Sequence, residues 1–186
     1  MKTIMDELKE VLSQPGWNDQ VAEEFERVQI LDEGAADMGE NVDTCMHLHL
    51  LSILCRKGRK VGFSDQDGEI RLSTRAAVLA FKRCIEICER LHRDGETDVK
   101  IMDQLNRSYY GIADLLLKES NRQQDSEKQL ALLKESRLYA NLQRDLLQKA
   151  VAAGESEYNH DFAGQFVALS EMLLEMINDN IREIEG

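Results

Sequence analysis

The sequence predicts an all-α protein made of antiparallel helix pairs, about seven helices in all, and three observations support this. Leu, Ala, Glu, Lys, Gln and Arg are abundant among the 186 residues, and all six favour helices. Pro15 is the only proline, so the frequent turns of a strand-rich fold have little support. Apolar residues recur three or four positions apart along most of the chain, as they do on one face of a helix.

Three helices are expected in the first part of the chain. The first helix begins near Thr3 and is stopped by Pro15, and Asn18 caps the second. The third is capped by Asp43 or Thr44. It ends in a basic run, whose cations complement the negative end of the helix dipole.

A fourth helix is expected after a loop at 58–68. It starts at Ser73 or Thr74 and stops at Gly95. Its expected apolar face consists of Val78, Phe81, Ile85, Cys88 and Leu91.

Three more amphipathic helices complete the chain. The fifth begins at Thr97 or Asp98. The sixth begins at Ser126, because Gln129 three residues later gives the spacing of a capping box, and it runs to about Ala153. The seventh stays apolar almost to the C-terminus, so we expect it to dock along its length. The expected apolar stripes are Leu130, Leu133, Leu138, Leu142 and Leu146 in the sixth helix and Phe162, Phe166, Leu169, Leu173, Ile177, Ile181 and Ile184 in the seventh.

The third, fifth and seventh helices share a pattern of apolar residues. The third matches the fifth at an offset of 59 residues, and the fifth matches the seventh at 57. Such a period is typical of stacked helix pairs, in which each pair buries its apolar face against the next. The alternative is a chance match, since any two amphipathic helices align at some offset. The matched residues are Met46, Leu50 and Ile53 with Leu105, Tyr109 and Ile112, and Leu105, Tyr109, Ile112 and Leu116 with Phe162, Phe166, Leu169 and Leu173.

Two consecutive helices carry small, aromatic and leucine residues at a distinctive spacing. Ala77 is followed by Phe81 and then Cys84 in the fourth helix, and Leu105 is followed by Tyr109 in the fifth. These residues resemble the second helix of one tetratricopeptide repeat and the first helix of the next. The resemblance implies antiparallel helix pairs stacked as a short, TPR-like, right-handed superhelix. We expect it to span 43–186, after an acidic helical segment at 1–42, within one compact domain overall.

The resemblance also implies a groove lined by the first helix of each pair, in which family members bind a peptide or a partner helix. The partner-binding residues expected on the fifth helix are Asn106, Arg107, Tyr110 and Ala113. Adjacent residues point about 100° apart on a helix. We therefore expect Tyr109 in the core and Tyr110 exposed.

The net charge of −12 indicates which partners to expect. Nucleic acid is excluded for the protein as a whole, because phosphate binding depends on positive charge. Residues 1–44 hold twelve acidic and three basic side chains, so a partner with a basic or amphipathic surface would be steered towards them. The alternative is that these acids only form a solvated face.

The four cysteines indicate a reducing compartment, since they lie in apolar helical patterns and suit small buried side chains better than a disulfide framework. They are Cys45, Cys55, Cys84 and Cys88. Cys45 and His49 share a helix face and offer two zinc ligands, but without paired cysteines nearby we expect core packing and no metal.

No catalytic or cofactor-binding motif is present, so we expect no enzyme, no catalytic residue and no cofactor. No run approaches the ~18 apolar residues of a membrane span, and no secretory signal is readable at the N-terminus, so we expect no membrane association and a cytoplasmic location. The predicted function is a protein–protein interaction module: an adaptor, chaperone or regulatory subunit. The alternative is a small acidic inhibitor or immunity-type antagonist that masks a basic site on its target.

Overall fold

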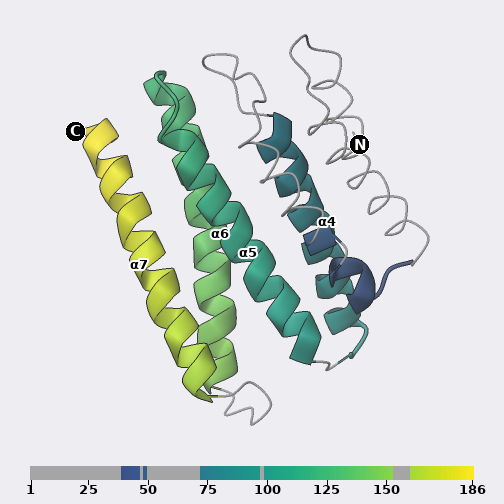
Figure 1. The fold of residues 1–186 in the computed structure, drawn as a ribbon. Coiled ribbons are helices and arrows are strands. Elements are labelled where there is room, and N and C mark those ends of the chain that lie inside the picture. The colour runs from purple at the N-terminus through teal and green to yellow at the C-terminus, as the bar shows by residue number, and fades with distance from the viewer. Residues whose placement is uncertain (1–38, 47, 50–71, 97–98, 153–159) are drawn as a thin grey trace, which may run out of the picture. The chain divides into compact units, whose positions relative to one another are not determined.

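The computed structural model describes residues 39–46, 48–49, 72–96, 99–152 and 160–186 (Figure 1). All regular structure among these residues is α-helical, as the sequence predicts, and none of them lies in a strand. The first two expected helices and the loop expected at 58–68 lie outside the described residues. No helix in the described part is long and apolar enough to cross a bilayer.

The chain divides into two compact units, Met1–Glu96 and Thr97–Gly186. The boundary expected after residue 42 stays a prediction. In the first unit, residues 42–46 and 48–49 are helical and are followed by α4 (Leu72–Arg93). The second unit contains α5 (Val99–Ser120), α6 (Ser126–Ala152) and α7 (His160–Glu185).

The helical segment at 42–49 is capped by Asn41, so the cap expected at Asp43 or Thr44 was placed too late. The backbone N–H of Thr44 donates to Asn41 Oδ1 at 3.0 Å, which is the bond of an N-cap to the third residue of a helix. The Thr44 hydroxyl lies inside the first turn and donates to the carbonyl of Gly39. This start places Cys45 in the first turn with its side chain buried.

α4 ends at Arg93, and Gly95 terminates it, as expected, in a Schellman motif. The N–H of Glu96 donates to the carbonyl of Leu91 at 3.0 Å, and that of Gly95 to the carbonyl of His92 at 3.2 Å. Gly95 has a φ of 90°, a conformation that side chains with a Cβ rarely adopt. The buried face of α4 consists of Ala77, Ala80, Phe81, Cys84, Ile85, Ile87, Cys88 and Leu91.

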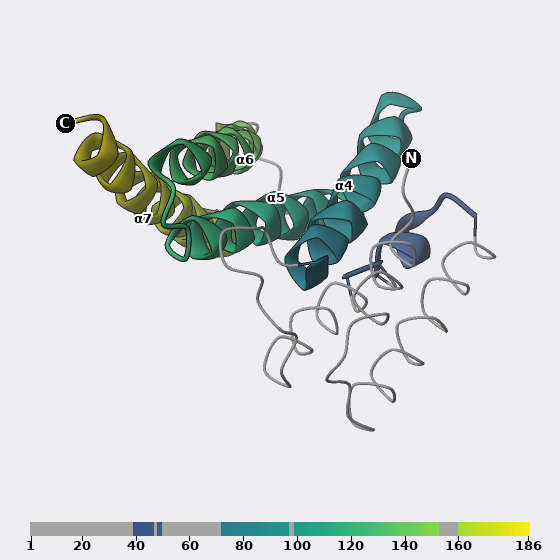
Figure 2. The same ribbon diagram turned by 90° about the horizontal axis from the view of Figure 1, so that it is seen from above.

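In the second unit, α6 packs antiparallel against both α5 and α7 (Figures 1 and 2). The start of α6 differs slightly from the prediction, because Asp125 rather than Ser126 is the cap. Its Oδ1 accepts from the backbone N–H of Glu127 at 2.9 Å and of Lys128 at 3.2 Å. Asp125 also places an acid at the positive end of the helix dipole.

The three helices of the second unit meet in one main apolar cluster. A smaller, separate group joins α5, α6 and α7 around the buried Leu147. Buried apolar area is the main favourable term in folding, so these contacts hold the three helices together. The main cluster consists of Ala113, Leu117, Leu133, Ala140, Leu173, Leu174, Ile177 and Ile181.

The apolar stripe expected for α6 was wrong at two positions. Leu138 and Leu142 are 55% and 40% exposed, although both were expected in the core. Leu138 follows Leu133 by five residues, which turns it by about 140° on a helix and carries it away from the core side. The core side is instead made largely of small and polar residues. The buried residues of α6 are Leu132, Leu133, Ser136, Ala140, Gln143, Leu147 and Ala150.

The stripe expected for α7 is confirmed at Leu173, Ile177 and Ile181, which are buried. It was wrong at Leu169, which is 49% exposed. The buried face also includes Ser170 and Leu174, which the expected stripe did not contain. The apolar surface of α7 is therefore wider than its contact with the other helices.

The predicted placement of the two adjacent tyrosines of α5 is confirmed. Tyr109 is buried, with its ring 6.5 Å from that of Tyr139, and Tyr110 is 40% exposed. Tyr109→Ala should lower the free energy of unfolding by about 2 to 4 kcal/mol, as large-to-small core changes do. Tyr110→Ala should change it by less than about 0.5 kcal/mol, as surface changes usually do. Urea unfolding of the two variants measures this, and equal losses would contradict the packing described here.

Candidate functional site

The four residues expected to bind a partner lie on one side of α5, where two of them are buried and two are exposed. Asn106 and Ala113 are buried. Arg107 and Tyr110 are exposed. Only Arg107 and Tyr110 therefore offer surface to a partner.

The exposed side of α5 is dominated by ion pairs between its own residues. Arg107 Nε lies 2.7 Å from Asp103 Oδ2, and Lys118 Nζ lies 2.6 Å from Asp114 Oδ2, both with the four-residue spacing of helix neighbours. Among the described residues of α5, Tyr110 is the only large apolar side chain that is well exposed. α5 thus offers one aromatic anchor between charged pairs, and little apolar surface.

Asn106 has a structural role inside the second unit. Gln143 Nε2 on α6 donates to Asn106 Oδ1 at 2.9 Å, and both side chains are almost fully buried. Two turns away along the pair, the Ser136 hydroxyl donates to the backbone carbonyl of Ala113 at 2.7 Å. These two bonds give partners to the Ser136 hydroxyl and to the amide nitrogen of Gln143, which lowers the cost of burying them. Among the described residues, Gln143 Oε1 is buried without a hydrogen-bond partner.

A larger apolar surface lies on α7, formed by Leu169, Met172 and Met176, which we name the α7 strip. The three side chains are 49%, 61% and 56% exposed. Their spacing of three and four residues puts them on one face of the helix, beside the face that packs into the core. Methionine adapts its shape readily and is common on protein-binding surfaces. The prediction for α7 did not include the two methionines.

Four acidic residues run alongside the α7 strip. Glu171, Glu175, Asp179 and Glu183 are all exposed and recur every four residues, and we name them the acidic row. Asp179 is paired with Arg182. Glu175 and Asp179 each follow a methionine of the strip by three residues, which makes them its neighbours on the helix surface. The face therefore combines an apolar centre with a negative edge.

A small surface hollow of about 290 Å³ lies in the first unit. Its volume is at the lower end of that of ligand pockets. An ion pair between Arg90 and Glu40 neutralises part of its lining. The lining residues are Glu40, Arg83, Glu86, Ile87 and Arg90.

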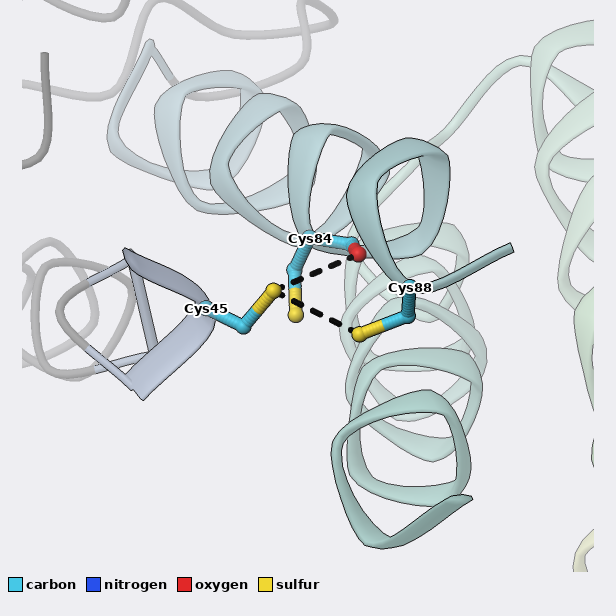
Figure 3. A group of neighbouring side chains, drawn as sticks. All are labelled: Cys45, Cys84 and Cys88. Carbon is cyan, nitrogen blue, oxygen red and sulfur yellow. Dashed lines mark hydrogen bonds between the residues drawn. The ribbon is translucent and has the colours of Figure 1, made fainter. Parts of the chain in front are cut away.

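The first unit also brings together three buried thiols, from Cys45, Cys84 and Cys88, which we name the thiol cluster (Figure 3). Cys84 and Cys88 are one turn apart on α4, and Cys45 points at them from the segment at 42–49. Its sulfur lies 3.4 Å from the sulfur of Cys88 and 3.7 Å from the carbonyl oxygen of Cys84. All three sulfur atoms lie within 4.8 Å of one another, and all three residues are fully buried.

Two large apolar side chains close in sequence to the thiol cluster are also buried. They are Leu48, three residues after Cys45, and Phe81, three residues before Cys84. The ring of His49 meets that of Phe81 edge-on, with 5.1 Å between the ring centres. The neighbouring Cys84 thiol is the main cause that raises the pKa of Cys45 to about 12; burial adds to this, and Cys88 acts in the opposite direction. The pKa of Cys88 is also raised, above all by the Cys45 thiol. Cys45 and Cys88 are therefore protonated at neutral pH.

The sequence predicted part of this cluster. The expectation that Cys45, Cys84 and Cys88 are buried and not joined by disulfides is confirmed, while Cys55 lies outside the described residues. The candidate zinc ligands, however, were grouped as Cys45 with His49, which lie on one helix. The four-residue spacing of Cys84 and Cys88 was the available signal, but only packing of two helical segments brings Cys45 to that pair.

The state of the thiols can be tested with a chromogenic disulfide reagent on a Cys55→Ser background. Buried, protonated thiols should react slowly at pH 8 and quickly once the protein is unfolded. A Cys45 pKa raised from 9.0 to about 12 also means that the unfolded chain loses this proton first. Stability should therefore be fully present below pH 9 and fall as the pH rises from 9 to 12. Rapid reaction of the folded protein at pH 8 would contradict the burial of the cluster.

The buried amide pair can be tested by a double-mutant cycle. Gln143→Leu removes the donor to Asn106 Oδ1 and should lower the free energy of unfolding by about 1 to 3 kcal/mol. Asn106→Leu should have an effect of similar size. The double variant should lose clearly less than the sum of the two, because no unpaired partner remains. Urea unfolding gives the values, and strictly additive losses would show that the two amides do not interact.

The chain matches no protein-family model, no curated protein and no solved structure in comparisons with each.

Proposed function

We propose that the protein is a protein–protein interaction module, an adaptor, chaperone or regulatory subunit, that binds an amphipathic helix with basic residues along α7. The observation that carries this proposal is the α7 strip, Leu169, Met172 and Met176, exposed beside the acidic row. Single exposed apolar residues are ordinary, but three on one helix face form a patch that favours binding.

The form of the strip suits a helix as its partner. Helices that dock on helical surfaces present anchors three and four residues apart, which is the spacing that the strip itself shows. Flexible methionine side chains fit such anchors closely without a preformed pocket.

The acidic row suits basic residues on the flank of the partner helix. Its four carboxylates, at Glu171, Glu175, Asp179 and Glu183, extend along three turns of α7. Exposed charges of this kind raise association rates and select the partner more than they add affinity. The net charge of −12 acts in the same direction.

The tetratricopeptide-like repeat is part of the same proposal and has support from the helix ends and the burial pattern. α4 and α6 end at Arg93 and Ala152, which are 59 positions apart, the offset found between the third and fifth helices. The same offset relates buried residues of the two helices: Ala77, Phe81 and Cys84 correspond to Ser136, Ala140 and Gln143. We infer from this that each unit holds one copy of a duplicated helix pair, with the superhelical arrangement as its expected consequence.

The alternative function, an antagonist that masks a basic site, is supported by the same acidic row. If the protein masks a basic site by charge, the carboxylates carry the binding and the α7 strip is incidental. The two readings therefore differ in whether apolar or acidic substitutions abolish binding.

Fluorescence anisotropy with labelled synthetic peptides tests the proposal. The probes are an amphipathic helix of Leu and Lys, a scrambled peptide of the same composition without an apolar face, and an amphipathic helix of Leu and Glu. We expect binding of the first peptide only. Met172→Gln with Met176→Gln should weaken it at least about tenfold, or about 1.4 kcal/mol, because apolar contacts are lost.

Matched variants separate the surfaces. Leu138→Gln removes an equally exposed apolar side chain on α6, and Tyr110→Ser removes the aromatic anchor of α5, so both should leave the affinity unchanged. Glu171→Gln with Glu175→Gln should mainly slow association. Equal binding of the scrambled peptide, or an unchanged affinity after the two methionine substitutions, would refute docking on the α7 strip and favour the antagonist.

A further inference from the structure

The thiol cluster is unused by the proposed function, which concerns the second unit. Three buried cysteines from two helical segments converge in the first unit (Figure 3). Cysteine is a common buried residue, so one thiol in a core needs no explanation. Three thiols that face one another do need an explanation, because alanine or valine side chains could fill the same space without a reactive group.

We propose that Cys45, Cys84 and Cys88 bind a thiophilic d¹⁰ metal ion, zinc(II) or copper(I), through three thiolates. Zinc binds cysteine sulfur at about 2.3 Å, which sets ligand sulfur atoms roughly 3.8 to 4.0 Å apart in tetrahedral or trigonal geometry. The observed separations of 3.4 Å between two sulfurs and at most 4.8 Å overall bracket that spacing. Small side-chain rotations therefore suffice to form the site.

The chemical identity of the donors selects the metal class. Soft thiolate ligands favour copper(I) and zinc, whereas calcium, magnesium and manganese require oxygen ligands. No aspartate or glutamate belongs to this cluster in the described part of the chain. The spacing also resembles that of known zinc sites, in which two ligands lie a few residues apart and further ligands come from another segment. Here Cys84 and Cys88 are one turn apart on α4, and Cys45 comes from the neighbouring segment.

Metal binding here exchanges protons and transfers no electrons. Each of the three S–H bonds breaks so that the electron pair stays on sulfur and forms the metal–sulfur bond, and three protons pass to the buffer. With zinc, three thiolates give a net charge of −1, and a neutral fourth ligand completes a tetrahedron. His49, one turn after Cys45 on the same segment, is the candidate for that position, and water is the alternative.

The experiment uses the full chain, freed of metal with a chelator, reduced, and kept without oxygen. Zinc(II) is titrated in one arm and copper(I) in the other, and native mass spectrometry counts the ions bound and the protons displaced. We expect one ion per chain in at least one arm, with loss of three protons. X-ray absorption of the loaded protein should show three sulfur ligands, a readout that needs no variant.

Variants then locate the ion. Cys45→Ala, Cys84→Ala and Cys88→Ala should each weaken binding at least a hundredfold, while Cys55→Ser should bind like the unchanged protein. Circular dichroism confirms that each variant is folded, and alanine is chosen because it remains apolar in the core. Cobalt(II) serves as a spectroscopic probe: a changed tetrahedral spectrum in His49→Ala assigns the fourth ligand to His49, and an unchanged one assigns it to water.

Three outcomes would overturn the proposal. One is the absence of stoichiometric binding in both arms. Another is binding that survives in folded alanine variants of the cluster, or that depends on Cys55. The last is a metal environment with fewer than three sulfur ligands. Each is independent of the α7 strip, so it leaves the proposed partner binding unaffected.

Discussion

The close approach of α6 to α5 is the interaction on which the second unit depends. α6 lies against both of its neighbours and presents small or polar residues, Ser136, Ala140 and Gln143, where a bulky apolar face would be usual. Small side chains let the helices approach closely, and the two polar ones are tolerated because they bond to α5. Leu173, Ile177 and Ile181 of α7 then cover the other side of the same cluster. Since most of the stability of helices in proteins comes from tertiary packing of an amphipathic face, order in this unit comes from packing.

The two units use the same kind of position for different chemistry. Cys84 of α4 and Gln143 of α6 are 59 positions apart, and both face the partner helical segment from a buried site. In one unit the contact at this position joins thiols, and in the other it joins two amides. Small, weakly polar groups of either kind fit between closely packed helices, but only the thiols can also serve as ligands to a metal ion. The proposed partner-binding face on α7 lies outside these buried contacts.

Helix periodicity predicted the described helices, their ends to within a few residues, and the facing of Tyr109 and Tyr110. It failed where local rules compete. Asn41 and Asp125 are the N-caps, although neighbouring residues have equally suitable side chains. Which residue becomes the N-cap depends on where the preceding chain enters the helix. Leu138 and Leu142 were taken for core because leucine is usually buried, whereas Ser136 and Gln143 were overlooked because hydrogen bonds to α5 cannot be read from sequence. The thiol cluster and the α7 strip escaped for the same reason: each depends on how segments distant along the chain pack together.

The bond between Asn106 and Gln143 has a consequence for the alignment of α5 and α6. A sliding of one helix along the other by a single turn, about 5.4 Å, would set both amides against aliphatic side chains and strip each of its partner. An interface of alanine and leucine alone would tolerate that shift far better, since apolar contacts do not depend on pairing one particular residue with another. The amide pair adds little to the stability of the correct register but destabilises incorrect ones. It therefore selects one alignment of α5 and α6.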